Sequence, residues 1–165
     1  MPAKYFIDID SRLQRLYLWE PNPEGDRLIR EYPVSTAKNG LGEKSGSYCT
    51  PRGRHRIAEK IGAGQPLYAV FKARVPTGEV WSRELAREKP GCDWILTRIL
   101  WLEGLEEGRN RGGTVDSHGR YIYIHGTDVE HLVGTPASHG CIRMRNADVA
   151  ELFELVEEGT EVRIG

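Results

Sequence analysis

Short apolar runs that alternate with polar residues and end at turn residues constrain the fold of this chain most strongly. Residues 4–10 alternate apolar positions with mostly acidic ones, which is the period of a half-buried strand. Turn chemistry follows at Asp10-Ser11, and residues 14–19 and 28–34 predict two more strands of an antiparallel meander. The 19 glycines and 9 prolines among the 165 residues suit a chain with many turns. We therefore expect a mainly β fold.

The rest of the chain predicts further strands and one principal helix. Residues 147–158 repeat apolar positions at i, i+3, i+4 and i+7, which predicts an amphipathic helix that Gly159 is placed to end. Residues 74–93 contain at most one short helical turn and form a candidate lid or substrate wall, or a surface insertion. The predicted fold is a single domain over residues 1–165, a β-sandwich or partly closed barrel with the helix packed against it. The additional strands are expected at residues 54–58, 67–71, 94–102, 121–125 and 161–164.

Charge and hydropathy argue against several classes of function. The 23 basic and 24 acidic residues nearly cancel, and no basic run is interleaved with aromatic residues, so nucleic-acid binding is disfavoured. No stretch reaches about 18–20 apolar residues, so we expect no transmembrane segment. Residues 1–20 lack the apolar core and the cleavage site of a signal peptide, and we expect no export signal in this chain as written. The oligomeric state cannot be predicted from these features.

The three cysteines, Cys49, Cys92 and Cys141, include no Cys-x-x-Cys pair. A zinc ribbon or a dithiol redox site is therefore not supported. Cys49 and Cys92 could pair in an oxidising compartment and leave Cys141 free, but the sequence does not show whether they meet. We expect free or buried thiols at these two positions.

The pattern that indicates chemistry is a cysteine in a tight turn, preceded by a histidine at the end of an apolar strand. Cys141 follows Ser138-His139-Gly140, and His125 lies sixteen residues upstream, directly before Gly126. A free thiol has a pKa of about 8.5, and an adjacent imidazole can take its proton and favour the thiolate. We therefore predict that Cys141 is a nucleophile and that His125 is the base that makes it a thiolate.

The turn before the cysteine predicts a binding site for a developing oxyanion. Gly140 allows a positive φ, or a close approach of the backbone to a substrate. Consecutive amides in such a turn can donate to an oxyanion, and removing one such donor has cost about 2.7–4 kcal/mol of barrier in other enzymes. The candidate donors are the amides of Gly140 and Cys141, with that of His139 as a third.

These residues resemble the signature of the L,D-transpeptidase (YkuD-like) family. The resemblance lies in Ser138-His139-Gly140-Cys141-Ile142-Arg143 together with the upstream His125-Gly126. Three further stretches resemble segments of the family in the same order. They are the opening strand pair at 7–10 and 14–17, the Thr-Pro-x-Gly segment at 50–57, and the closing strand at 159–164. The resemblance thus covers nearly the whole chain and implies a domain of the L,D-transpeptidase catalytic type.

The resemblance implies a role for each of the site residues. Cys141 would be the nucleophile, His125 the base, and the carbonyl of Gly126 would orient the imidazole ring. His139 would support the site from the turn before the cysteine. The family resemblance implies no cofactor and no metal ion. The residues expected to bind polar groups of the substrate are Arg143 and Ser138.

The function implied by the resemblance is that of an acyltransferase acting on peptidoglycan stem tetrapeptides. Cys141 would attack the carbonyl between the third, diamino residue and D-Ala, release D-Ala and leave an acyl-thioester. An amine of a second stem would then form a 3→3 cross-link. Water as the acceptor would instead give an L,D-carboxypeptidase that trims the tetrapeptide to a tripeptide. The resemblance favours the cell envelope or periplasm, and a cytosolic enzyme acting on soluble muropeptides is the alternative.

The sequence leaves other classes of function open. His125, His131, His139 and Cys141 are all metal-ligand types, and His118 lies near them in the sequence. Their spacing is not that of regular zinc sites, and the Glu of a His-Glu-x-x-His motif is absent. A papain-like protease is disfavoured because its cysteine precedes its histidine. An inactive peptidoglycan-binding module is the remaining alternative.

Overall fold

The computed structural model describes residues 3–165; Met1 and Pro2 of the predicted domain lie outside the described residues. The helices are α1 (Arg83–Glu88) and α2 (Asn146–Leu155), and single 3₁₀ turns are η1 (Gly113–Val115) and η2 (Glu130–Leu132). The strands are β1 (Phe6–Asp10), β2 (Arg15–Glu20), β3 (Arg27–Pro33), β4 (Gly53–Ile61), β5 (Ala69–Lys72), β6 (Val75–Val80), β7 (Ile95–Gly104), β8 (Tyr123–Gly126), β9 (Ile142–Met144) and β10 (Glu161–Ile164).

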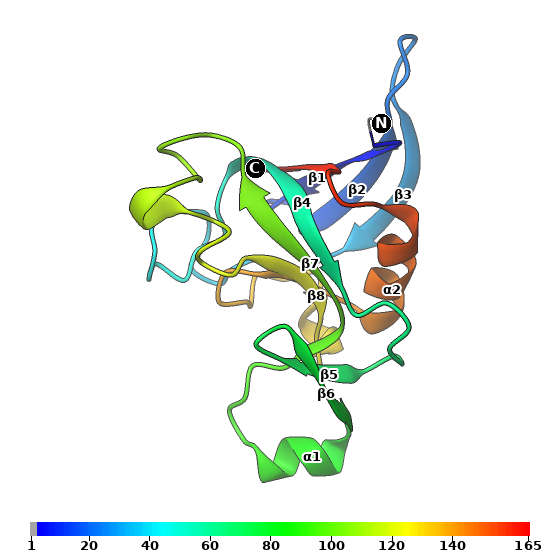
Figure 1. Ribbon diagram of the computed structural model, residues 1–165, viewed down its shortest axis with the longest axis vertical. Coiled ribbons are helices and arrows are strands. Elements are labelled where there is room, and N and C mark those ends of the chain that lie inside the picture. Colours follow the sequence, from blue (N-terminus) through cyan, green and yellow to red (C-terminus); the bar gives the residue numbers. More distant parts are fainter. Residues whose placement is uncertain (1–2) are drawn as a thin grey trace.

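The ten strands form one continuous sheet, so the predicted mainly β fold is confirmed. Its strand order is β3-β2-β1-β10-β4-β7-β5-β6, with β8 added to β7 and β9 added to β8. The sheet branches at β7, where Ile99 pairs with Ile61 of β4 and also with His125 of β8. The sheet bends around a core and does not close into a barrel (Figure 1).

One face of the sheet supplies most of the core. The alternation read from the sequence is present in the structure, since Ile7 and Ile9 of β1 and Leu16 and Leu18 of β2 are buried. Helix α2 packs its own apolar side chains against this face and contacts β7 and β8 (Figure 1). Each such side chain, fully buried, contributes about 1.5–3 kcal/mol of hydrophobic free energy. The helical side chains in the core are Val149, Leu152 and Phe153.

The principal helix is shorter than predicted. It ends at Leu155 rather than at residue 158, because Val156 already has extended dihedral angles of φ −112° and ψ 163°. The turn that contains Gly159 (φ +92°) therefore lies four residues beyond the helix end. Gly159 allows the chain to reverse into β10.

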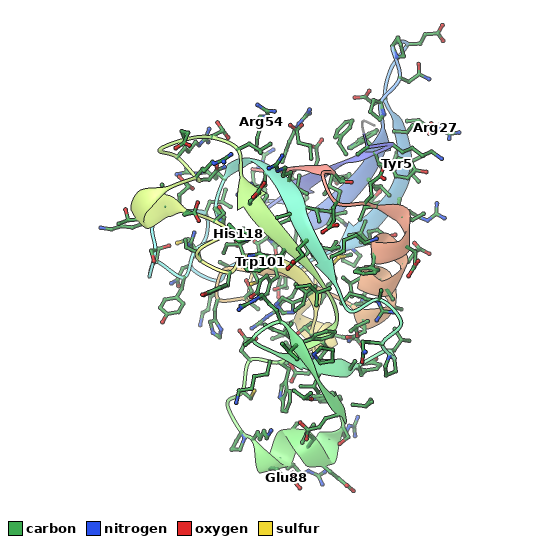
Figure 2. All side chains as sticks on the ribbon, in the orientation of Figure 1. Tyr5, Arg27, Arg54, Glu88, Trp101 and His118 are labelled. Atoms are coloured by element: carbon green, nitrogen blue, oxygen red, sulfur yellow. The ribbon has the colours of Figure 1, made fainter. Side chains whose placement is uncertain are left out.

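Residues 69–88 form one edge of the sheet, the β5–β6 hairpin, and the short helix that follows it. The β5–β6 hairpin and α1 project from the end opposite the two termini, and Glu88 lies near the tip (Figures 1 and 2). Strand β6 lies where the sequence predicted only loops and a helical turn. Helix α1 begins after Ser82, whose side chain accepts a hydrogen bond of 3.1 Å from the Leu85 amide, as an N-cap does. Across residues 3–165, no helix combines the length and the apolar composition that a membrane crossing requires.

A buried histidine connects the sheet to the long loop that precedes β8. His55 on β4 is completely inaccessible to solvent. Its Nε2 lies 2.8 Å from the Ser117 hydroxyl and its Nδ1 lies 3.1 Å from the Gly53 carbonyl. Burial disfavours the charged imidazolium and lowers the pKa of His55 to about 4. The loop carrying Ser117 is therefore anchored to β4 by a neutral ring.

We expect His55 to make the stability of the protein depend on acid pH. Between pH 6.5 and 4 the unfolded chain binds a proton that the folded His55 does not, so the free energy of unfolding falls as the pH is lowered. The loss from this one group should be about 3 kcal/mol. Urea unfolding of the wild type and of His55→Gln at pH 7.5 and pH 4.5 measures it. The variant should show the smaller difference between the two pH values, and equal differences would contradict a depressed pKa at His55.

Candidate active site

The parallel pairing of β8 with β9 brings the predicted histidine and cysteine onto one face of the sheet. Ile124 pairs with Ile142 and His125 pairs with Arg143. The isoleucines point into the core, so the alternate residues point to the opposite face. Cys141 directly precedes β9 and is therefore diagonal to His125. Diagonal positions on neighbouring strands are about 7–8 Å apart, which is within the reach of longer side chains.

The thiol of Cys141 lies against the edge of β8. Its Sγ donates to the Tyr121 carbonyl at 3.3 Å and accepts from the Tyr123 amide at the same distance. The side chain also packs against a small apolar cluster that includes Tyr123 and Ile99. Burial disfavours the thiolate, and although the Tyr123 amide opposes this effect, the pKa of Cys141 is raised to about 12. In the free protein the sulfur therefore keeps its proton.

The imidazole of His125 is fixed in one orientation and one tautomer. It is 2% exposed, and its Nδ1 lies 2.8 Å from the Gly126 carbonyl. A carbonyl can only accept, so Nδ1 carries the proton and Nε2 keeps its lone pair. Burial also lowers the pKa of His125, although the Gly126 carbonyl and Asp93 favour the charged ring. The ring is therefore a neutral base.

Gly126 is required by the close approach of Asn146 and Leu96 to the backbone that follows His125. A Cβ added there would collide with Oδ1 of Asn146 and would lie 2.7 Å from the Leu96 carbonyl. The Asn146 side chain is itself fixed, because it donates to the Thr127 carbonyl at 2.8 Å and accepts from the Thr97 hydroxyl at 2.5 Å. Asn146 thus links the start of α2 to the strand that ends at His125.

The resting state differs from the predicted thiolate–imidazolium pair. Among residues 3–165, no hydrogen bond joins the His125 ring to the Cys141 sulfur, whose partners are the backbone groups of β8 and the residues before it. Both pKa shifts favour the neutral forms, since burial penalises each charge. The arrangement suits transfer of the proton during attack on a substrate better than storage of a thiolate.

The turn before the cysteine is closed by Ser138. Its hydroxyl donates to the Cys141 carbonyl at 2.6 Å and accepts from the Gly140 amide at 3.2 Å. Gly140 has a φ of +134°, which side chains with a Cβ rarely adopt, and its carbonyl accepts from the Thr50 hydroxyl at 2.9 Å. The Gly140 amide is therefore occupied, whereas the Cys141 amide has no acceptor within the described part of the chain. The Ser138 hydroxyl uses its one hydrogen in the bond to the Cys141 carbonyl and therefore has no donor for a substrate.

Asp93 connects the two remaining predicted residues. Its carboxylate accepts from Nδ1 of His139 at 3.0 Å and from the Arg143 guanidinium at 2.9 Å. Burial opposes its charge, but the nearby Arg143, His125 and His139 outweigh this and lower the pKa of Asp93. Arg143 is only 6% exposed and also donates to the Ala137 carbonyl at 3.1 Å. Arg143 therefore orients His139 through Asp93, and His139 remains exposed.

Arg120 fixes the loop that faces the thiol. Its guanidinium donates to the carbonyls of Cys49 at 2.7 Å and Glu43 at 3.1 Å, and more weakly to that of Gly42 at 3.3 Å. Burial lowers the pKa of Arg120, while the neighbouring thiols of Cys49 and Cys141 act in the opposite direction. One cation thus joins the 42–49 loop to the wall of the site.

Two hollows meet at His139. The first, of about 330 Å³, is bounded by Cys141, Tyr121, Arg120 and Tyr48 as well as by His139. The second, of about 570 Å³, contains Lys38, Asn39, Ser138 and Asp93 and shares Tyr48 and His139 with the first. The rings of Tyr48 and His139 lie edge to face with their centroids 6.3 Å apart. These two side chains therefore lie between a pocket that contains the thiol and one that contains Asp93 and Lys38.

The residues that the sequence prediction missed come from distant loops. Asp93 ends the 74–93 segment, and Arg120 lies in the long loop before β8, so no local pattern marks either residue. Cys49 and Cys92 are free thiols in the structure, as expected. Within residues 3–165, no group of three or more His, Cys, Asp or Glu side chains is arranged to hold a metal ion. The metal-site alternative therefore has no set of ligands to support it.

The chain is similar over almost its whole length to one protein family. The profile of the YkuD L,D-transpeptidase catalytic domain matches residues 4–164. The chain is 31% identical over 130 residues to Probable L,D-transpeptidase ErfK/SrfK of Salmonella typhimurium, a match covering 71% of this chain and 40% of the relative. It is 33% identical over 95 residues to Probable L,D-transpeptidase YbiS of Escherichia coli, covering 50% and 31% respectively. The chain thus spans less than half the length of either relative.

A solved structure shares the fold. The L,D-transpeptidase from Mycobacterium smegmatis superposes on this chain with a TM-score of 0.56 at 16% sequence identity. The match covers 99% of this chain and 59% of the other. At this level of identity the likeness concerns the fold, and it agrees with the bent, open sheet described above.

We expect alkylation of Cys141 to be slow at neutral pH and to accelerate steeply with pH. Because burial raises the pKa of this thiol to about 12, the thiolate fraction and the rate with iodoacetamide should rise about tenfold per pH unit between pH 7 and 9. A variant with Cys49→Ser and Cys92→Ser isolates Cys141, and intact mass follows the reaction. A rate that is already constant near pH 7 would instead indicate the thiolate–imidazolium pair predicted from the sequence.

Proposed function

The chain belongs to the family of L,D-transpeptidase catalytic domains, and from this premise we propose that it transfers acyl groups of peptidoglycan stem peptides through Cys141. The donor is a tetrapeptide stem, and the bond broken joins the third, diamino residue to the terminal D-Ala. The acceptor is an amine of a second stem, which gives a 3→3 cross-link. In this proposal the enzyme works in the cell envelope, where cross-linked stems are found.

One observation supports this proposal most directly. The Cys141 thiol lines a pocket of about 330 Å³, while His125 lies on the same face of the neighbouring strand with its Nδ1 proton held by a carbonyl. A nucleophile, an oriented base and a pocket are the parts that acyl transfer requires. Among the described residues the only other cysteines, Cys49 and Cys92, have no histidine on a neighbouring strand in the same arrangement.

In the first half of the reaction the sulfur replaces the amine of D-Ala. Sγ attacks the carbonyl carbon as its proton passes to Nε2 of His125, and the carbonyl oxygen becomes an oxyanion. The free Cys141 amide stabilises this oxygen, and the Gly140 amide joins it by leaving the Ser138 hydroxyl. His125 then gives its proton to the departing nitrogen, and the C–N bond breaks. The products are D-Ala and an acyl-thioester on Cys141.

In the second half an amine takes the place of the sulfur. The amine attacks the thioester carbonyl and passes a proton to His125, and the C–S bond breaks. His125 returns that proton to the sulfur, which restores the neutral thiol. Because the same imidazole gives and takes one proton in each half, its neutral resting form is the one that both halves need.

We expect Cys141→Ala to abolish release of D-Ala from a defined muropeptide tetrapeptide. The variant lacks the sulfur that forms the thioester, so the substrate mass should remain unchanged. Product masses measured for the wild type separate the outcomes, since a dimer indicates cross-linking and a tripeptide indicates hydrolysis. The control is Cys92→Ala, which removes an exposed thiol and should leave turnover unchanged. Turnover by Cys141→Ala would refute the role of this residue.

We expect the activity to fall only on the acid side of pH 6.5. The free enzyme must hold His125 neutral, and burial lowers the pKa of His125 below its usual 6.5, so protonation inactivates the base only at lower pH. A profile of kcat/KM for D-Ala release between pH 4.5 and 8 should show this acid limb. His125→Ala should lose about 10²–10⁴-fold in rate together with the limb. A limb centred above pH 7 would be inconsistent with a buried neutral base.

A further inference from the structure

The turn of the β5–β6 hairpin holds an arginine in a strained position. Lys72 pairs with Val75, so Ala73 and Arg74 are the two central residues of the turn. Both have left-handed backbones, with φ of +48° and +66°. Asparagine and glycine are the usual residues in such a turn, because a side chain with a larger Cβ substituent is disfavoured there. Strain of this kind is often found at functional positions.

The guanidinium of Arg74 is fixed by three aromatic side chains. Its central carbon lies 4.9 Å from the centroid of the Trp101 ring and 4.8 Å from that of Tyr121. One of its N–H groups donates to the Tyr123 hydroxyl at 2.9 Å. The Trp101 ring is in turn stacked on His118, with centroids 4.0 Å apart (Figure 2). The cation is therefore preorganised before any ligand arrives.

The residues that hold Arg74 also hold the nucleophilic sulfur. The Tyr121 carbonyl accepts from Sγ of Cys141, and the Tyr123 amide donates to it, each at 3.3 Å. Tyr121 and Cys141 both line the 330 Å³ pocket. Arg74 thus contacts the side chains of two tyrosines whose backbones contact the sulfur, and one of them, Tyr121, lines the thiol pocket.

Arg74 has donors to spare, and unlike the other arginines near the thiol it is bound to neither a backbone carbonyl nor a carboxylate among the described residues. Arg120 donates to three carbonyls and Arg143 to a carbonyl and the carboxylate of Asp93. The guanidinium of Arg74 carries five N–H groups, and within residues 3–165 the Tyr123 hydroxyl is its one acceptor and no carboxylate lies within ion-pair distance. Arg74 is only half-buried, so these donors can reach a ligand.

We propose that Arg74 binds a free carboxylate of the donor stem peptide beside Cys141. The proposal rests on the proposed function, because the ligand is the substrate of that reaction. A planar guanidinium held flat by aromatic rings presents two parallel N–H groups to a carboxylate, which lysine cannot do. The carboxylate is either the terminal one of D-Ala or the side-chain one of a diamino diacid at the third position. Peptides amidated at one position or the other distinguish these two sources.

The test compares Arg74→Asn with Lys72→Asn. Asparagine tolerates the left-handed conformation at residue 74, so the first variant removes the charge without disturbing the turn. Lys72 is exposed on the same hairpin, and its replacement removes one positive charge without touching the three aromatic rings. Each variant is made in the active protein and in Cys141→Ala. The first set reports KM and kcat for D-Ala release, and the second reports Kd for the peptide without turnover.

The expected result is a loss of about 10- to 100-fold in affinity for the free-acid tetrapeptide in Arg74→Asn, and none in Lys72→Asn. Amidation of the carboxylate that Arg74 binds should weaken peptide binding to the protein that keeps Arg74 by the same factor. The affinity of Arg74→Asn should not change on amidation, because the variant no longer binds that carboxylate. The carboxylate that Arg74 binds is the one whose amidation weakens binding to the protein with Arg74 but not to Arg74→Asn. Alkylation of Cys141 by neutral iodoacetamide should be equal in both variants, because Arg74 acts on the ligand rather than on the thiol.

The two proposals can fail separately. Binding that depends on Arg74, without conversion of the peptide, would refute the proposed reaction and leave the carboxylate site standing. Conversion with unchanged affinity in Arg74→Asn would overturn the carboxylate site alone. An equal loss on the free acid and on both amides, or a changed alkylation rate, would assign Arg74 a structural role and also overturn it. Absence of peptide binding to every protein would reject both.

Discussion

The short parallel pairing between β8 and β9 is the constraint on which the site depends. In most of the sheet neighbouring strands are antiparallel, but here two strands joined by the fifteen residues 127–141 run in the same direction. Their register puts Ile124 beside Ile142 in the core, and a shift of either strand by one residue would turn that strand's isoleucine away from it. The cost of exposing those side chains therefore fixes His125 and Cys141 on the same outer face. The hydrophobic core, rather than any contact between the two groups, determines their relative position.

Buried polar side chains hold the backbone near this pairing where the sheet is irregular. Thr97 has a φ of +73° at a bulge of β7, which is unusual for a β-branched residue, and its hydroxyl joins Asn146. Thr50 accepts from the Ala37 amide and donates to the Gly140 carbonyl, so one hydroxyl joins two loops to the cysteine turn. Each of these side chains is completely or almost completely buried and has its hydrogen bonds satisfied. The strained backbone is therefore stabilised by partners that come from distant parts of the chain.

The sequence predicts those parts of the structure that depend on local periodicity or on a motif of neighbouring residues. The strands alternate as expected, α2 forms one amphipathic helix, and the motif residues from Ser138 to Arg143 lie in one turn and strand. The side chains that contact those motif residues could not be predicted, because they come from distant parts of the chain that meet only in the folded protein. Asp93 contacts His139 across forty-six residues, and nothing in its neighbourhood distinguishes it from the other acidic residues. The protonation state also depends on burial, so a thiol–imidazole motif alone predicted a thiolate where the folded environment favours the neutral pair.

The arginines around the thiol differ in whether their guanidinium groups bind the protein itself or can bind a ligand. A guanidinium that is surrounded by carbonyls, as Arg120 is, stabilises loops and has little capacity left for a ligand. Arg143 neutralises Asp93, and the pair adds no net charge to the site. Arg74 on the β5–β6 hairpin differs from both, because among the described residues its side-chain hydrogen bond goes to the Tyr123 hydroxyl rather than to a carbonyl or a carboxylate. The hairpin lies at the edge of the sheet, so the sequence of its turn can change with little effect on the core, while the β8–β9 pairing and the side chains it positions stay the same.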